Sequence, residues 1–221
     1  YFWRKKMKKS KFKLFAALLL AAAMTVLSLS GAAPVLADET AAILANAAKS
    51  PAVHTAPEGY DQNDFNKVRT FLEQTDSNGI RNGEKLNPDG YDPDDPESWG
   101  ALFVDEWGFE HEAYFDWEEV DGINRMFAIN LTYIRDFAGP FDMSGLDALS
   151  TLDVDGGNFT TADLSNCYEM THCYFANSTL SSVNFFNCAN VTELYLQDNE
   201  LTEVLNLGDC TSLLFLDILM N

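Results

Sequence analysis

Lysine and arginine are scarce in most of this sequence. The chain has 14 Lys and Arg against 34 Asp and Glu, and seven of the basic residues lie before residue 38, where there is no acidic residue. From residue 38 onward the formal net charge is therefore −27. A surface this acidic repels phosphate backbones, so we expect no nucleic-acid partner.

Residues with catalytic or metal-binding potential are also few. The chain has three His, and it lacks a GxSxG nucleophile motif and a phosphate-binding Gly-rich loop. His111 stands in FEHEAY without the second His that a zinc protease helix needs. We therefore expect no enzymatic activity, and no catalytic, cofactor or metal site.

Calcium is the one ion that the sequence leaves open. The segments DSNGIRNGE (76–84) and DGYDPDDPE (89–97) gather oxygen ligands, but neither has the spacing of a helix-loop-helix calcium site. Asp, Asn and Gly are also the residues that form turns. We favour turn chemistry for both segments.

The N-terminus has the pattern of an export signal. A basic stretch, KKMKKSKFK, precedes the apolar run LFAALLLAAAMTVLSLS and the small residues of GAAPVLADE. We predict a signal peptide over 1–37, with residues 1–6 an upstream read-through before Met7. The apolar run is short for a membrane span and breaks at Gly31 and Pro34, so we expect no transmembrane span after cleavage.

An Ala-rich segment, 38–59, follows and reads as a flexible leader. After it, we assign 60–127 to a small α+β head region with the N-terminal cap. Helical spacing of apolar residues predicts a helix over 62–75, capped by Asp61, and the Asn-Gly pair in IRNGEKL (80–86) predicts a hairpin.

Three short strands are expected in the rest of the head region. They are ALFV, AYFDW and NRMFAINL, at 101–104, 113–117 and 124–131. The large rings of Trp99, Trp107 and Trp117 are expected in the core.

An internal repeat dominates the C-terminal part of the chain. Residues 149–169, 170–190 and 191–212 share apolar residues at positions zero, three, five, ten, thirteen and fifteen, counting the first residue as zero. A truncated copy begins at 213 and runs to 221. A degenerate copy, 128–148, is predicted with the corresponding apolar residues Leu131, Tyr133, Phe141, Met143 and Leu146.

The pattern L-x-x-L-x-L-x-x-N-x-L resembles the leucine-rich repeat of secreted bacterial surface proteins, including the internalin-like group. The segments KVRTFLEQTDSNGIRNGEKLN and YDPDDPESWG also resemble the head region of surface proteins of gut Firmicutes. The resemblance implies a buried column of Asn, which Asn199 and Asn221 supply and which Gly157 and Ser178 interrupt.

We therefore predict a leucine-rich-repeat solenoid, mostly β, with a parallel concave sheet and extended convex segments, preceded by the α+β head. The spacing of two between positions thirteen and fifteen is typical of a strand rather than a helix. An apolar strand at the end of the chain predicts an N-terminal fragment of a longer protein.

The four cysteines fall on buried positions of this repeat. Cys167, Cys188 and Cys210 form one inward column, and Cys173 takes a Leu position. Parallel side chains on neighbouring strands hold their Cβ atoms farther apart than a relaxed disulfide needs. We interpret all four as free thiols in the core.

Side chains alternate along a strand, so positions two, four and six point out of the concave sheet. Ala176 and Leu219 belong to this pattern, and ten residues of it are the predicted partner-binding surface. They are Thr151, Asp153, Asp155, His172, Tyr174, Glu193, Tyr195, Gln197, Phe215 and Asp217. Exposed Tyr residues favour a binding role, and cross-strand packing of the two rings is the alternative.

Two functions fit these observations. The chain is either a secreted or wall-attached recognition module for a protein or glycan partner, or the targeting module of a larger surface enzyme whose catalytic domain lies beyond residue 221. In both cases we expect an extracellular protein.

Overall fold

The strands form two sheets, one mixed and one parallel. The computed structural model describes residues 54–221 except 105–107, 133 and 135, so the predicted signal peptide, Trp107 and Tyr133 lie outside the described residues. One sheet has seven strands, in the order β1 (Ala101–Val104), β2 (Glu110–Val120), β3 (Ile123–Asn130), β5 (Thr151–Asp155), β7 (His172–Ala176), β9 (Glu193–Tyr195) and β10 (Phe215–Asp217). The other contains β4 (Phe141–Asp142), β6 (Thr161–Asp163) and β8 (Ser182–Asn184).

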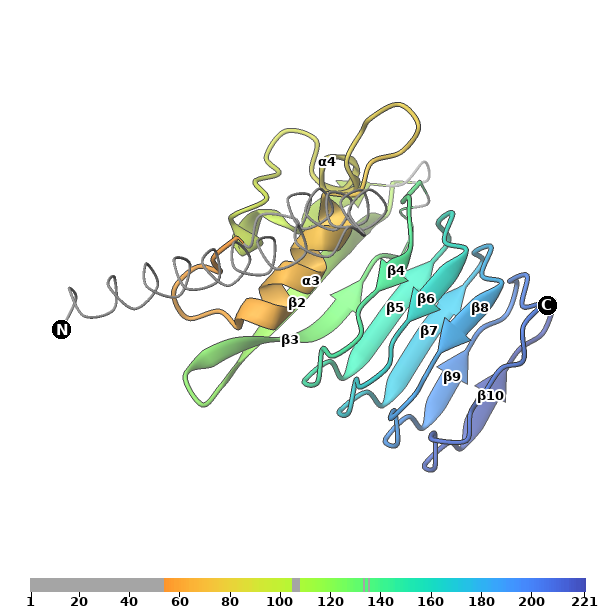
Figure 1. Cartoon of the computed structure of the whole chain (residues 1–221). Helices are drawn as coiled ribbons and strands as arrows, with labels where there is room; N and C mark the ends of the chain where they lie inside the picture. The colour runs from red at the N-terminus through yellow and green to blue at the C-terminus, as the bar shows by residue number, and fades with distance from the viewer. Residues whose placement is uncertain (1–53, 105–107, 133, 135) are drawn as a thin grey trace, which may run out of the picture. The chain divides into compact units, whose positions relative to one another are not determined.

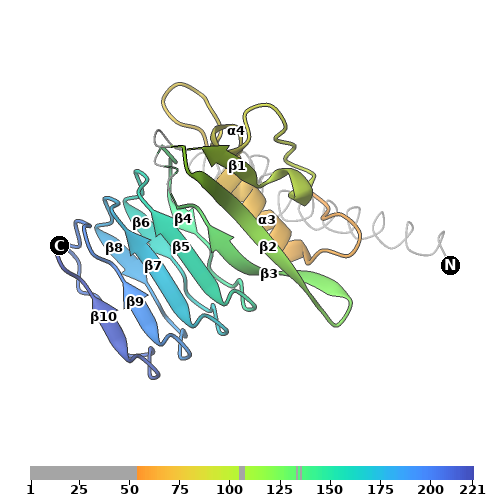
Figure 2. The same ribbon diagram turned by 180° about the vertical axis from the view of Figure 1, so that it is seen from behind.

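The repeats form a solenoid of about four turns. Strands β5, β7, β9 and β10 pair in parallel and lie side by side in both views of the chain (Figures 1 and 2). Position three of each copy is in register, because Leu152 pairs with Cys173, Cys173 with Leu194, and Leu194 with Leu216. The second extended segments of the first three copies pair as β4, β6 and β8, which confirms that they are strands. The corresponding segment of copy 191–212, around Leu205 and Leu207, forms no strand.

The first strand of the degenerate copy pairs two residues away from its predicted register. Ile129, not Leu131, pairs with Leu152, and the Leu131 N–H donates to the Asp153 carbonyl at 2.8 Å. Phe141 nevertheless pairs with Ala162, as predicted. The chain between β3 and β4 is therefore two residues longer than in the next copy, and this insertion hides the true register.

Helix α3 (Gln62–Leu72) confirms the predicted helix, although it ends three residues early. The Asp61 side chain accepts hydrogen bonds from the backbone N–H groups of Asn63 and Asp64, as expected of an N-cap. Phe71 on the buried side lies 5.3 Å from the ring of Phe141 and 6.0 Å from that of Phe159. The helix therefore covers the apolar interior at the first coil.

The hairpin predicted over 80–86 is wrong, because this segment contains helix α4 (Asn82–Leu86). The Glu84 carboxylate accepts a hydrogen bond from the Arg81 N–H at 3.0 Å, which begins the helix. The Asn82 side chain is buried and donates to the carbonyls of Phe71 and Ala138 at 3.0 Å each. This buried anchoring outweighs the turn preference of Asn-Gly.

Strands β1, β2 and β3 confirm the three predicted strands. Strand β2 extends beyond the predicted segment at both ends, and it turns into β3 through Asp121 and Gly122, both with positive φ. Trp99 is fully buried, and its ring lies 6.1 Å from that of the half-buried Trp117. The short 3-10 helix η1 (Pro96–Ser98) precedes Trp99.

Left-handed backbone recurs at two corners of the coils. Such φ values suit Gly, Asn and Asp, which avoid or offset the Cβ clash. The first corner contains Gly145 (φ 77°), Asn166 (63°) and Asn187 (63°). The second contains Gly156 (92°), Asn177 (49°), Asp198 (55°) and Met220 (60°).

A buried Asn links neighbouring coils. The Asn199 amide donates to the carbonyls of Phe175 at 2.8 Å and Leu196 at 3.0 Å, and its oxygen accepts from the Leu180 N–H at 3.2 Å. Asn221 repeats these contacts one coil later. One coil earlier, the Ser178 hydroxyl donates instead to the Gly156 carbonyl at 2.8 Å.

All four cysteines are free and buried, as predicted. The thiol of Cys167 lies 3.4 Å from the Met143 carbonyl oxygen, and that of Cys188 lies 3.1 Å from the Leu164 carbonyl oxygen. Burial raises the pKa of the Cys188 thiol to about 11. These thiols are neutral core groups at ordinary pH.

Candidate functional site

The predicted binding residues lie on one face of the seven-stranded sheet, which we call the outer face. Their strand neighbours Leu152, Val154 and Cys173 are fully buried on the opposite side. In register, one row contains Thr151, His172, Glu193 and Phe215, and the next contains Asp153, Tyr174, Tyr195 and Asp217. Asp155 and Gln197 lie at the strand ends beside these rows.

Ala176 does not contribute to the outer face, contrary to the alternation pattern. It is fully buried, although it pairs with Asp155 at the position predicted to face outward. Its methyl group is shorter than the side chains around it, and the Asn177 amide bonds to the Asp155 carboxylate beside it at 2.7 Å. The neighbouring side chains therefore cover it.

Three aromatic rings follow one another across the outer face. The ring centroids of Tyr174 and Tyr195 are 5.9 Å apart, and those of Tyr195 and Phe215 are 4.9 Å apart. Interplanar angles of 42° and 36° give tilted contacts, so each ring packs against the next and leaves an edge toward solvent. The arrangement is compatible with cross-strand packing and with contact to a partner.

Hydrogen bonds fix the two tyrosine hydroxyls. The Tyr195 hydroxyl donates to the Glu193 carboxylate at 3.2 Å, and the Gln197 amide donates to the Tyr174 hydroxyl at 3.2 Å. Glu193 also lies 3.5 Å from Nε2 of His172. These contacts restrict the side-chain rotamers, which lowers the entropy that a binding partner would have to overcome.

Carboxylates border the rings. Burial raises the pKa of Asp153, and the nearby His172 opposes this rise. Burial and the negative charge of Asp155 raise the pKa of Tyr174, so its hydroxyl stays protonated. The outer face thus combines neutral aromatic groups with negative charge.

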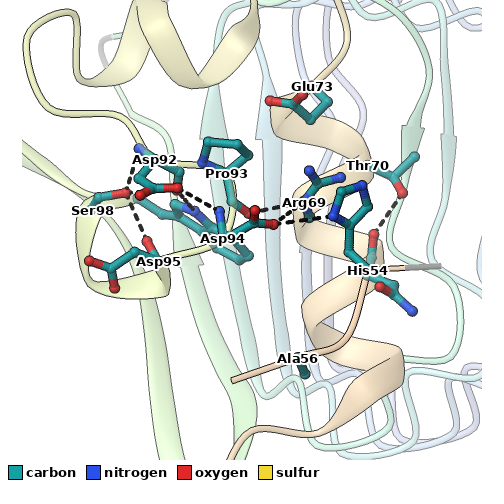
Figure 3. Close-up of polar contacts among 12 residues, drawn as sticks. His54, Ala56, Arg69, Thr70, Glu73, Asp92, Pro93, Asp94, Asp95 and Ser98 are labelled. Atoms are coloured by element: carbon teal, nitrogen blue, oxygen red, sulfur yellow. Dashed lines mark hydrogen bonds and ion pairs between the residues drawn. The ribbon is translucent and has the colours of Figure 1, made fainter. Parts of the chain in front are cut away.

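The Asp- and Pro-rich loop of the head is held against helix α3 (Figure 3). The Asp94 carboxylate lies 3.2 Å from Nε of Arg69 and 3.3 Å from Nδ1 of His54. Within the loop, Asp92 accepts from the Asp94 N–H and Asp95 from the Glu97 N–H. The Asp92 and Asp95 carboxylates therefore stabilise turns, and the Asp94 carboxylate forms an ion pair with Arg69.

The segment 76–84 uses its oxygens in the same way. Asp76 accepts from the N–H groups of Asn78 and Ile80, and pairs with Lys85 at 2.9 Å. Over 54–221, leaving aside the undescribed positions, no group of three His, Cys, Asp or Glu is placed to hold a metal ion. The contacts support turn chemistry for both Asp-rich segments.

A groove in the head was not foreseen from the sequence. It measures about 1200 Å³ and lies between the 76–80 turn, strand β1 and the chain around Ile134. Apolar residues such as Leu102 line it together with the Asp76–Lys85 pair. Its walls come from segments far apart in the chain, so no local sequence motif predicts it.

Comparisons with known proteins assign no function to this chain. No protein-family model matches the chain, and no significant match was found among curated proteins or solved structures. Within the described part of the chain, no helix combines the length and apolarity required to cross a membrane.

Proposed function

We propose that this chain is a secreted or cell-surface recognition module of the leucine-rich-repeat type, which binds a protein or glycan partner through the outer face. The observation that carries the proposal is the series of three adjoining rings, Tyr174, Tyr195 and Phe215, with carboxylates at its border. Aromatic rings whose rotamers are already restricted are efficient contact groups at interfaces.

The leucine-rich-repeat assignment is supported by the interior of the coils. Apolar side chains occupy positions three and five, and Asn199 bonds to backbone groups of its own coil and of the preceding coil. A repeat whose Asn satisfies backbone groups in this way fits the consensus L-x-x-L-x-L-x-x-N-x-L. Export is supported by the basic and apolar N-terminal sequence.

The test is capture of a ligand from host-cell and mucus extracts by the wild-type chain and by a Tyr174→Ala/Tyr195→Ala variant. The matched control is Phe186→Ala, because Phe186 is 56% exposed and follows strand β8 of the other sheet. We expect the double variant to lose the ligand with little change in its melting curve, and the control to keep it. Unchanged capture with a lower melting temperature would contradict the proposal and assign the rings to packing.

A further inference from the structure

We propose that the partner of the outer face is a basic protein segment that presents arginine to the rings of Tyr174, Tyr195 and Phe215. This inference rests on the proposed function and specifies the chemistry of its partner. It is carried by the distribution of charge over the repeats and by the position of the rings among the carboxylates.

The repeats are negatively charged without internal compensation. Residues 136–221 contain thirteen Asp and Glu and no Lys or Arg. Within the described chain, two cations of the head pair with carboxylates of this region, Lys67 with Asp142 and Arg125 with Asp147. Both pairs lie at the first coil, away from the outer face of the later coils.

On the outer face, the carboxylates have no Lys or Arg partner within the described chain. Asp153 and Asp217 stand at the two ends of the row that contains Tyr174 and Tyr195. Among the ten predicted binding residues His172 is the basic one, and it lies 3.5 Å from Glu193. Since Asp153 is partly desolvated, a cation beside it interacts more strongly than one in bulk water.

Arginine fits this surface better than lysine does. Its planar guanidinium can stack on an aromatic ring and donate two parallel hydrogen bonds to a carboxylate, whereas a lysine ammonium is a point charge. In register, Tyr195 pairs with Asp217 and Phe215 with Glu193, so one guanidinium can reach both a ring and a carboxylate. An acidic glycan would be repelled, and a neutral glycan would leave the charge uncompensated.

The preference of the outer face for arginine can be tested with labelled nona-arginine and nona-lysine peptides. Their binding to the full chain is followed by fluorescence anisotropy at physiological ionic strength. The diagnostic variant is Asp153→Asn/Asp217→Asn, since Asn keeps the shape and the acceptor oxygen that caps the Leu219 N–H. The matched control is Glu200→Gln/Glu203→Gln. It removes the same charge from two exposed residues that lie beyond the corner at Asp198.

We expect nona-arginine to bind several-fold more tightly than nona-lysine. The face variant should weaken nona-arginine binding by about tenfold, and the control by less than about twofold. Equal weakening by both variants would show attraction to the overall charge and would overturn the inference, as would equal affinity for the two peptides.

A displacement experiment with the ligand captured through the tyrosines tests this inference separately from the proposed function. If nona-arginine does not displace that ligand, and if the ligand proves to be a glycan, the inference fails and the binding role of the outer face stands. If the ligand is displaced by nona-arginine but not by nona-glutamate, both are supported.

Discussion

Nε of Arg125 lies 2.8 Å from Oδ2 of Asp64, a carboxylate whose side chain is fully buried. The same oxygen accepts a hydrogen bond from the Met126 N–H at 3.1 Å. Arg125 also bonds to Asp147 in the first coil. Helix α3, strand β3 and the repeats are therefore joined through one guanidinium.

Replacing Asp64 by Ala should destabilise the protein by about 3–5 kcal/mol, because it removes the buried partner of Arg125 and leaves the Met126 N–H without its acceptor. The measurement is urea unfolding followed by circular dichroism. The contrasting variant is Lys67→Met, which removes the more exposed pair with Asp142 and should cost no more than about 1 kcal/mol. Similar losses in the two variants would show that the Asp64 contact is not a structural link.

Stability should decline at high pH through Cys188. Its thiol has a pKa of about 11 in the folded chain, against about 8.5 in an unfolded chain. A folded-state pKa above the unfolded value contributes stability that is complete below about pH 8.5 and is lost as the pH rises to 11. We expect a loss of about 1–2 kcal/mol over this range, after allowance for solvent screening.

The Cys188→Ala variant isolates this contribution, because tyrosines titrate at high pH in both proteins. Its unfolding free energy should fall less steeply than that of the wild type between pH 8 and 11. Parallel pH profiles would refute the assignment. In the folded protein at pH 8, all four thiols should resist a thiol reagent that labels them after unfolding.

Asn199 should be among the most sensitive polar residues of the repeats. Replacement by Leu would leave the Phe175 and Leu196 carbonyls and the Leu180 N–H without partners, at a cost of about 2–4 kcal/mol. The control is Asn190→Leu, since the exposed Asn190 makes one hydrogen bond to the Tyr168 carbonyl. Chemical denaturation should show a loss below about 1 kcal/mol for the control.

Met220 offers a stabilising substitution. It occupies the left-handed corner at which earlier coils place Gly156, Asn177 and Asp198. Its side chain is 77% exposed, so little packing is lost on replacement. Met220→Asn should raise the unfolding free energy by about 0.5–1 kcal/mol, whereas Met220→Ala should give no gain. An equal gain in both variants would point to the loss of the Met side chain instead.

The solenoid could be predicted because its signal is repeated. Leu152, Cys173 and Leu194 recur at a fixed spacing, and each copy confirms the pairing of the others. The outer-face residues follow from the same register, since alternation along a strand assigns their direction. The four buried thiols follow for the same reason.

The errors arise where a single contact between distant segments decides the structure. Asn82 lies in helix α4 because its amide bonds to Phe71 and Ala138, and no local pattern reveals that partner. The insertion after β3 shifted Leu131 by two positions. Ala176 is covered by its longer neighbours, which alternation alone does not include.

The lack of Lys and Arg after residue 135 has a practical consequence for studying this protein. Trypsin cuts after these two residues, so it makes no cut within residues 136–221, whether the coils are folded or not. A protease that cuts beside large apolar residues would behave differently, because Phe159, Phe175 and Leu194 are fully buried in the folded coils. The rate of cleavage beside these three buried residues would measure the opening of the solenoid, with the tryptic peptide that contains residues 136–221 as an internal standard for the amount of repeat present.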